Sequence, residues 1–224
     1  MNSNEWSQVA ERSGAARKIL IDSEAILEND HFVYITGDHG AGWLDKDRIY
    51  PHTDRICELA RLLAEELAGL ETDVVCGPAM GGLVLSQWLA HHLKVLSVYA
   101  EHNPGLQSDR DGHSLRSDFV LRRNYDKLVC GKRVIVVDDI LNTGHSIRET
   151  IHAVKDAGGI VVAAASICTR GNTNAGLIGV EHLLCLCEVL IPSWSAAQCQ
   201  LCSDGVPINT AYAHGKEFVE RSRG

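Results

Sequence analysis

The stretch of residues 133–168 constrains the fold of this chain more than any other. Residues 133–137 are rich in β-branched valine and isoleucine, which is typical of a strand buried on both faces. Apolar side chains then recur at helical spacing over residues 146–157, and a glycine pair ends that helix before a second apolar run over residues 160–168. This order of strand, helix and strand predicts a parallel βαβ unit.

A second unit of the same kind precedes it along the chain. Residues 73–76 and 95–100 are expected to be strands, joined by the glycine-rich loop of residues 77–82 and a helix over residues 83–92. Strands that alternate with helices predict an α/β fold with a doubly wound, mostly parallel sheet. In such sheets ligands bind beyond the carboxyl ends of the strands.

Three parts are expected along the chain. Residues 1–70 hold a helix over residues 13–27, a stretch rich in glycine and histidine, and a second helix; we call this part the predicted hood. Residues 71–192 form the α/β core, and residues 193–224 form a tail with a C-x-x-C sequence. With 224 residues, 45% of them hydrophobic, the chain can bury one sizeable core.

The charge balance excludes several classes of partner. A net charge of −8 with neutral histidines removes the basic field on which binding to nucleic acids or anionic membranes relies. No apolar run approaches the roughly 18 residues of a membrane helix. The amino terminus is polar and has no signal-peptide pattern. We therefore expect a cytoplasmic protein without nucleic-acid or membrane partners, in which an anionic ligand needs a local site.

The loop after residues 133–137 carries the chemistry. Asp138 and Asp139 stand at the expected strand end, and their oxygens suit the hydroxyl groups of a sugar. Thr143, Gly144 and Ser146 lead into a helix, whose first N–H groups form a nest for phosphate. The loop therefore suits a ribose 5-phosphate. The alternative is an acidic turn that only caps the next helix.

The sequence VIVVDDILNTGHS at residues 134–146 resembles the phosphoribosyl-pyrophosphate (PRPP) motif of type I phosphoribosyltransferases. The resemblance implies that Asp138 and Asp139 hold the ribose hydroxyls, and it identifies GPAMGG at residues 77–82 as the pyrophosphate loop. The residues implied to bind the 5-phosphate are Asn142, Thr143, Gly144, His145 and Ser146. Those implied to meet the diphosphate are Ala79, Met80, Gly81 and Gly82, the first three through backbone N–H groups.

Within this class the chain is most similar to orotate phosphoribosyltransferases. The similar segments are HFVYITGDHGAGW at residues 31–43, FVLRR at 119–123, CTRG at 168–171 and CQLCSDGVP at 199–207. The resemblance implies that Arg170 meets the carboxylate of orotate and that His39 and Trp43 belong to the base site. Asn142 stands where members that use 6-oxopurines have an acid, and this amide favours a pyrimidine.

Glu101 and His102 depart from the family pattern, because the mobile lid usually carries a lysine at this place. We expect residues 101–118 to form the lid, since this long polar segment has no periodicity. His102 is then the candidate catalytic cation for the leaving pyrophosphate. Other candidates from the loop are Arg110, His113 and Arg116. The alternative for each is a solvated loop charge.

The resemblance implies an enzyme, a pentosyltransferase of pyrimidine nucleotide synthesis that works as a homodimer. Such a transfer to the base proceeds through an oxocarbenium-like state and needs no nucleophilic side chain of the protein. Mg²⁺ fits because it binds substrate phosphates and few protein carboxylates, here Asp138 and Asp139. Two alternatives stay open, a regulatory protein of the same fold that binds PRPP or a nucleotide, and a transferase for another base.

The chain has eight cysteines, and a protein expected in the cytoplasm uses them as thiols or metal ligands. One interpretation is a zinc site of four cysteines. Its members would be Cys185, Cys187, Cys199 and Cys202. The other interpretation is that the C-x-C pair lies on one face of a strand and packs in the core.

Overall fold

The computed structural model describes residues 3–34, 36–103, 118–171 and 173–222. The chain forms two compact units. We call them the core unit, Met1–Ala16 with Thr53–Glu188, and the second unit, Arg17–His52 with Val189–Gly224. Residues 17–52 of the predicted hood lie in one unit with the predicted tail, whereas residues 1–16 and 53–70 of the hood belong to the core unit.

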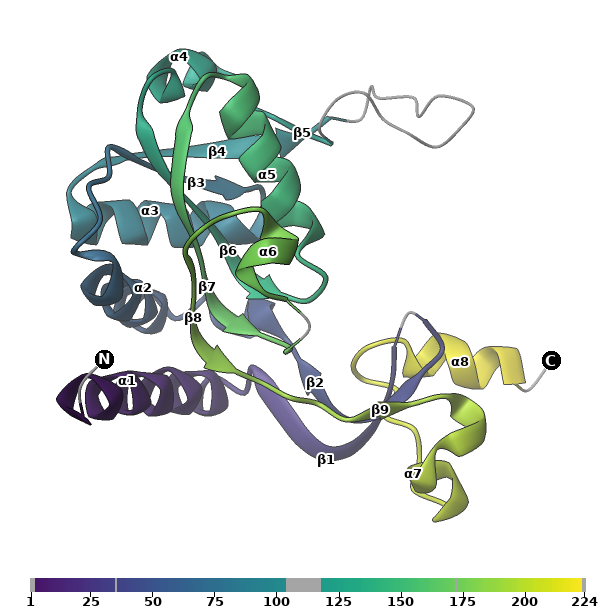
Figure 1. Ribbon diagram of the computed structural model, residues 1–224. Helices are drawn as coiled ribbons and strands as arrows, with labels where there is room; N and C mark the ends of the chain where they lie inside the picture. The colour runs from purple at the N-terminus through teal and green to yellow at the C-terminus, as the bar shows by residue number, and fades with distance from the viewer. Residues whose placement is uncertain (1–2, 35, 104–117, 172, 223–224) are drawn as a thin grey trace. The chain divides into compact units, whose positions relative to one another are not determined.

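The core unit is built on a six-stranded sheet with the order β5-β4-β3-β6-β7-β8 (Figure 1). In that order the strands are Phe119–Val120, Leu96–His102, Val74–Pro78, Arg133–Leu141, Ile160–Thr169 and Leu183–Glu188. The strands from β4 to β8 are parallel to their neighbours, and only β5 pairs antiparallel, with β4. From the central pair β3 and β6 the chain winds outward in both directions. The predicted doubly wound, mostly parallel sheet is confirmed.

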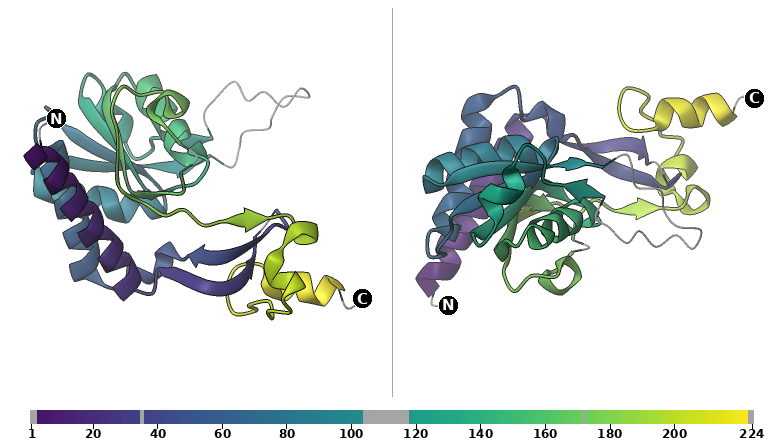
Figure 2. Two further views of the ribbon diagram at one scale, coloured as in Figure 1. Left: turned by 60° about the horizontal axis from the view of Figure 1, so that its bottom comes forward. Right: turned by 90° about the horizontal axis from the view of Figure 1, so that it is seen from above.

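Strand β6 shows why this sheet must be covered on both sides. Successive strand residues point to opposite faces, and Val134, Ile135, Val136 and Val137 are all fully buried. Val134 and Val136 belong to a cluster that includes residues of α5, whereas Gly82 at the start of α3 packs against Val137. Helices α3 and α5 therefore cover opposite faces of the sheet (Figure 2).

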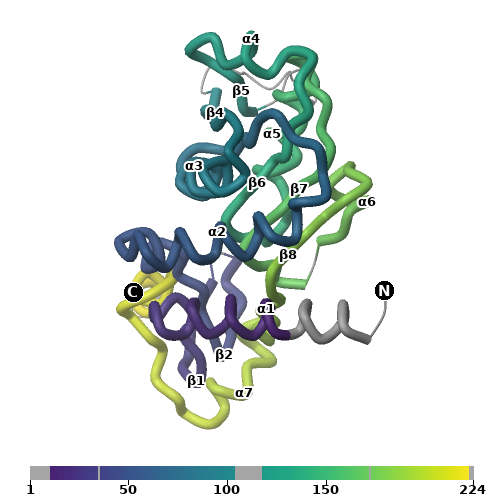
Figure 3. Tube along the Cα trace, turned by 90° about the vertical axis from the view of Figure 1, so that its left-hand side faces the viewer, coloured from purple at the N-terminus to yellow at the C-terminus, as the bar shows by residue number. Residues whose placement is uncertain are grey.

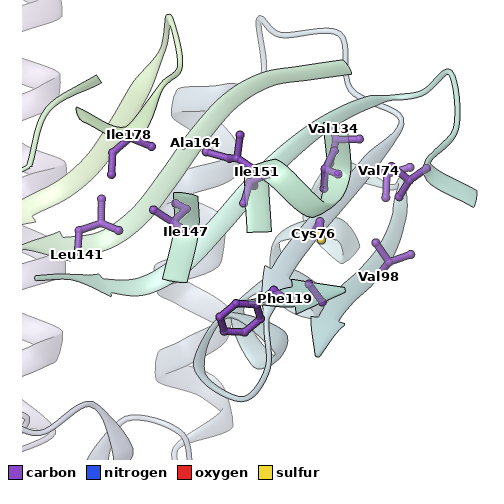
Figure 4. Packing of buried hydrophobic residues seen from close by; sticks show 14 residues of the cluster. Val74, Cys76, Val98, Phe119, Val134, Leu141, Ile147, Ile151, Ala164 and Ile178 are labelled. Carbon is purple, nitrogen blue, oxygen red and sulfur yellow. The ribbon is translucent and has the colours of Figure 1, made fainter. Parts of the chain in front are cut away.

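The helices of the core unit bury the apolar faces that the sequence pattern predicted. Helix α5 turns Ile147, Ile151 and Val154 toward the sheet, in one cluster with Leu141 and Ala164 (Figure 4). On the other face α2 and α3 lie side by side (Figure 3). The helix bounds are α2 Thr53–Leu67, α3 Gly81–Leu93, α4 Tyr125–Val129, α5 His145–Asp156 and α6 Ala175–Ile178.

Helix α1 spans Ser3–Asp22 and contributes residues to both units. The predicted helix over residues 13–27 is wrong at its end, because Ile26 already belongs to a strand of the second unit. The apolar side chain of Ile26, which fits a helical period, is buried in that strand instead. No helix in the described part of the chain is long and apolar enough to cross a membrane.

The second unit holds a three-stranded antiparallel sheet with the order β1-β2-β9. These strands are Ile26–Val33, His39–Leu44 and Ser193–Trp194. Its remaining elements are the 3-10 turns η1 Lys46–Arg48 and η2 Ala196–Gln198 and the helices α7 Gln200–Ser203 and α8 Gly215–Ser222. Strand β9 of the tail thus pairs with β2 of the hairpin, which explains why residues 17–52 and the tail belong to one unit.

Candidate active site

The carboxyl ends of four neighbouring strands bring the predicted site residues to one edge of the sheet. Strands β4, β3, β6 and β7 lie next to one another and run parallel. His102 is the last residue of β4, and the loop of residues 77–82 begins at the end of β3. Residues 138–146 run from the end of β6 into α5, and Arg170 comes directly after β7. Figure 1 shows these strands side by side in the sheet. This is the edge at which doubly wound sheets bind ligands.

Asp138 and Asp139 belong to the last part of β6, and their residues are only 8% and 2% exposed. The Asp138 carboxylate accepts a hydrogen bond from the N–H of Asp139 at 3.0 Å, and the Asp139 carboxylate accepts one from Ile140 at 2.7 Å. Asp138 also stands in register with Ser166 of the neighbouring strand. The backbone therefore fixes both carboxylates before any ligand arrives, which lowers the cost of binding.

Gly144 shapes the turn from β6 into α5. Its φ of +71° lies in the left-handed region, and a Cβ at this position would come within 2.4 Å of Cδ1 of Ile178. Gly144 has no side chain that could cap α5, and the hydroxyl oxygen of Thr143 accepts one long hydrogen bond, 3.4 Å, from the N–H of His145. Asn142, Thr143 and His145 are exposed around this terminus. The N–H groups of a first helical turn suit an anion, and a phosphate fits this position.

The glycine-rich loop packs tightly against β6. A Cβ on Gly77 would lie 2.2 Å from the carbonyl oxygen of Gly82, and a Cβ on Gly82 would lie 2.6 Å from that of Val137. Both positions therefore require glycine, and the loop comes next to the strand that carries the two acids. One predicted contact is not supported, because the N–H of Ala79 donates to the carbonyl of Ala100 at 2.8 Å. This N–H does not face a diphosphate, and Met80 and Gly81 remain as the predicted donors.

Glu101, at the expected lysine position, is neutralised by arginines that follow β5. Its carboxylate lies 2.8 Å from Nη2 of Arg123 and 3.7 Å from Nε of Arg122. This pairing raises the pKa of Arg123, so the cation stays charged. Sequence reasoning singled out neither arginine, although two consecutive arginines after a strand at this edge were a signal. The acid at the lysine position therefore carries no isolated negative charge.

His102 is exposed at the end of β4, with its ring edge-on to Phe119 at 5.6 Å. Strand β5 holds it there, since His102 and Phe119 are register partners. The other predicted cations of the loop, Arg110, His113 and Arg116, lie outside the described residues.

Arg170 is half-buried directly after β7. Its N–H donates to the carbonyl of Leu141 at 3.0 Å, which ties the start of this loop to the end of β6. The backbone therefore places Arg170 beside the turn that leads into α5.

The two other residues predicted for the base belong to the second unit. Trp43 lies on β2, and its ring stacks on Tyr34 at 6.1 Å between centroids. The base contact predicted for His39 is not supported, because this residue is fully buried. The His39 ring instead contacts His31, Cys202 and Phe218 within the same unit.

The structure gives no support to the predicted four-cysteine zinc site. Cys185 and Cys187 lie on β8 of the core unit, where Cys185 accepts a hydrogen bond from Ser166 at 3.1 Å. Burial raises the pKa of Cys185, so its thiol stays protonated. Cys199 and Cys202 belong to the second unit, where their ligand partners are histidines. Cys187 is buried and Cys185 packs, partly buried, against the core cluster, which favours the alternative interpretation.

Comparisons with known proteins agree with this geometry. The family model described as the phosphoribosyl transferase domain matches residues 45–176. A protein of Caldicellulosiruptor saccharolyticus named orotate phosphoribosyltransferase is 34% identical over 84% of this chain and 90% of its own length. One of the same name from Brucella anthropi is 38% identical over 80% and 85%.

Solved structures show the same fold. The orotate phosphoribosyltransferase of Mycobacterium tuberculosis superimposes with a TM-score of 0.60 at 21% identity, covering 81% of this chain and 97% of its own. That of Aeropyrum pernix gives a TM-score of 0.57 at 25% identity, covering 77% and 92%.

Proposed function

The chain belongs to the phosphoribosyltransferase family, and from this premise we propose that it transfers ribose 5-phosphate from PRPP to orotate with release of pyrophosphate. Two relatives named orotate phosphoribosyltransferase, similar over most of the chain, support the choice of base. The observation that carries the proposal is the end of β6, where two buried carboxylates lead through a glycine turn into the amino terminus of α5. An acid pair and a phosphate nest in this order suit a ribose 5-phosphate.

In this proposal the residues after β6 hold the sugar. The 5-phosphate accepts hydrogen bonds at the start of α5, with the hydroxyl groups of Thr143 and Ser146 as further donors. Asp138 and Asp139 accept hydrogen bonds from the ribose hydroxyls. Because backbone N–H groups already orient both carboxylates, the sugar is bound in one orientation.

The diphosphate is proposed to lie against the loop of residues 77–82. Gly77 and Gly82 hold this loop against β6, so the diphosphate and the ribose are bound at neighbouring strand ends. Asp138 and Asp139 are oxygen donors, the type of ligand that Mg²⁺ takes together with substrate phosphates, so these two residues would hold the ion. When bound, Mg²⁺ neutralises charge on the pyrophosphate.

Arg170 is proposed to orient the base. A guanidinium binds a carboxylate through two parallel hydrogen bonds, and orotate carries such a group. The position of Arg170 directly after β7 supports this role, because β7 is the neighbour of β6. A base held there is aimed at the anomeric carbon of the ribose, so the chain contributes position and electrostatic stabilisation rather than a nucleophile.

The remaining proposals concern the setting of the enzyme. We assign it to pyrimidine nucleotide synthesis, because orotate is the proposed base, and we propose a homodimer from the family resemblance. Sedimentation equilibrium of the full chain tests the dimer. A mass of one chain at micromolar concentration would overturn it.

A base screen tests the proposed activity. Pyrophosphate release is measured from PRPP and magnesium with orotate, uracil or a purine base as the acceptor. We expect release with orotate and little with the others. Release only with another base would contradict the base assignment and keep the transferase. PRPP binding without release with any base would instead favour the regulatory alternative, for which Glu101 at the lysine position is the supporting observation.

A further inference from the structure

Four side chains with metal-ligating atoms meet inside the second unit. They are His31 of β1, His39 of β2, and Cys199 and Cys202 at α7, and their ligand atoms all lie within 4.8 Å of one another. Nε2 of His31 lies 2.8 Å from Nδ1 of His39 and 3.5 Å from Sγ of Cys199. Sγ of Cys202 lies 3.3 Å from Nδ1 of His39 and 3.8 Å from Nε2 of His31.

The local structure explains why these residues meet. His39 pairs across the hairpin with Val33, two positions after His31, so the two histidines lie on the same face of neighbouring strands. Cys199 is the N-cap of α7 and Cys202 lies in its single turn, and residues three apart on a helical turn lie on the same side. The N–H of Asn209 donates to the carbonyl of His31 at 2.7 Å, so the tail is tied to β1 beside the cluster.

The protonation of His31 is fixed from outside the cluster. Its Nδ1 lies 2.8 Å from the carbonyl oxygen of Val206, and a carbonyl can only accept. Nδ1 therefore carries a proton, and in the neutral ring Nε2 presents a lone pair toward His39 and the two cysteines. A ring nitrogen held by a backbone carbonyl in this way is the usual support of a metal-binding histidine.

Hydrogen bonds alone do not account for this group. With both rings neutral and no metal bound, the single lone pair on Nε2 of His31 faces three groups that can donate, the Nδ1–H of His39 and the thiols of Cys199 and Cys202. In the other tautomer of His39, two ring lone pairs face each other at 2.8 Å. Nε2 of His39 is buried and has no hydrogen-bond partner among the described residues, so no contact on that side selects a tautomer. A cation at the centre uses all four lone pairs at once.

We propose that His31, His39, Cys199 and Cys202 bind one Zn²⁺ in a tetrahedral structural site. Zinc bonds of about 2.0–2.1 Å to nitrogen and about 2.3 Å to sulfur place neighbouring ligand atoms roughly 3.3–3.8 Å apart. Three of the four nitrogen–sulfur distances, 3.3, 3.5 and 3.8 Å, fall in this range, and all the ligand atoms lie within 4.8 Å of one another. The two nitrogens, at 2.8 Å, must separate by about half an ångström to admit the ion.

The donor set selects the ion and the role. Two thiolates and two imidazoles are ligands for zinc and not for Mg²⁺ or Ca²⁺, which take oxygen. Two thiolates also balance the charge of Zn²⁺. Four protein ligands leave no position for a substrate, and His31, His39 and Cys199 are at most 2% exposed. The ion therefore joins the tail to the β1–β2 hairpin and takes no part in the transfer reaction.

Metal analysis of the full chain tests this site. The protein is purified under reducing conditions without chelator and dialysed, and its zinc is measured by mass spectrometry. We expect about one zinc per chain, as in other four-ligand structural sites. After the metal is removed with a chelator, added Co²⁺ should give the visible absorption of a tetrahedral site with sulfur ligands. Both readouts are independent of phosphoribosyl transfer, so they also stand if the proposed activity fails.

Matched variants identify the ligands. Cys202→Ser and His31→Gln should abolish the Co²⁺ spectrum or weaken Co²⁺ binding at least tenfold. Cys130→Ser, at an exposed cysteine outside the cluster, and Cys185→Ser, on β8, should leave Co²⁺ binding unchanged. Circular dichroism checks that each variant is folded.

Three results would overturn the proposal. The first is a wild-type protein that contains no zinc and gives no tetrahedral Co²⁺ spectrum. This result is measured on the wild type alone and does not depend on whether a variant folds. The second is a disulfide between Cys199 and Cys202 in the reduced preparation. The third is loss of metal in Cys185→Ser equal to that in Cys202→Ser, which would restore the four-cysteine site.

Discussion

At the scale of single residues, Arg170 is the residue proposed to select the base. Its backbone is tied to the end of β6, so its position depends on the sheet rather than on a free loop. Lysine keeps the charge but cannot form the two parallel hydrogen bonds of a guanidinium. An arginine at this position therefore recognises the planar geometry of a carboxylate as well as its charge.

Arg170→Lys should raise the KM for orotate about tenfold or more, because charge-assisted hydrogen bonds contribute about 1.5–3 kcal/mol. The Kd for PRPP should stay nearly unchanged. Steady-state kinetics with varied orotate and calorimetry with PRPP measure the two effects. Arg55→Lys on α2 is the control substitution and should change neither quantity. An unchanged KM for orotate in Arg170→Lys would remove Arg170 from the base site.

At the scale of elements, the turn from β6 into α5 is expected to affect both the stability of the fold and the binding of PRPP. Gly144→Ala should lower the free energy of unfolding by about 1–2 kcal/mol through the left-handed conformation and by about 1–3 kcal/mol through contact with Ile178. It should also weaken PRPP binding, because it displaces the start of α5. Denaturant unfolding and calorimetry measure these effects.

Gly131→Ala is the matched control for this substitution. Gly131 has a φ of +69°, yet a Cβ there would meet no atom within 4 Å. It should show only the smaller loss of stability and bind PRPP normally. Equal PRPP affinities in the two variants would show that the turn does not form the phosphate site.

Arg133 ties the beginning of β6 to the segment before β3. Its guanidinium and N–H donate to the carboxylate of Asp73 at 2.9–3.2 Å, and these hydrogen bonds lower the pKa of Asp73 to about 2. Because the pKa is lower in the folded protein, the pairing stabilises the fold above the unfolded pKa of about 3.9. This stabilisation is lost as the pH falls from about 4 to about 2.

Asp73→Asn should therefore lower the unfolding midpoint in urea at pH 7 and have little effect near pH 2. Midpoints at several pH values measure the difference between wild type and variant. Asp156→Asn, at an exposed aspartate of α5, is the control and should show a smaller difference. A difference for Asp73→Asn that stays constant down to pH 2 would contradict the role of its charge.

The elements also show how far the sequence could predict this protein. The secondary structure of residues 133–168 was predictable. The buried strand β6 contains a continuous apolar run, and the inner face of α5 has apolar residues at helical spacing. The hydrogen bond from the N–H of Ala79 to the carbonyl of Ala100 was not predictable, because it depends on the pairing of β3 with β4. The helix expected to continue through Ile26 ended early because pairing with β2 outweighs the local helical pattern.

At the scale of the whole molecule, segments far apart in the sequence build the second unit. Strand β9 contains only Ser193 and Trp194, too short to be predicted from alternation, and it pairs with β2. The same pairing brings the C-x-x-C sequence of the tail to the hairpin that carries His31 and His39. The prediction of a zinc site from cysteines alone did not include these two histidines. Their H-x7-H spacing across a glycine-rich turn was the signal in the sequence.

The central claim is that the end of β6 binds PRPP, and calorimetry of PRPP with magnesium tests it most directly. The wild-type chain should bind PRPP, and the double variant Asp138→Asn, Asp139→Asn should bind at least about tenfold more weakly, since hydrogen bonds to charged groups are lost. Circular dichroism and the unfolding midpoint should show that the variant is folded. An unchanged Kd in the folded variant, or no PRPP binding by the wild type, would contradict the account.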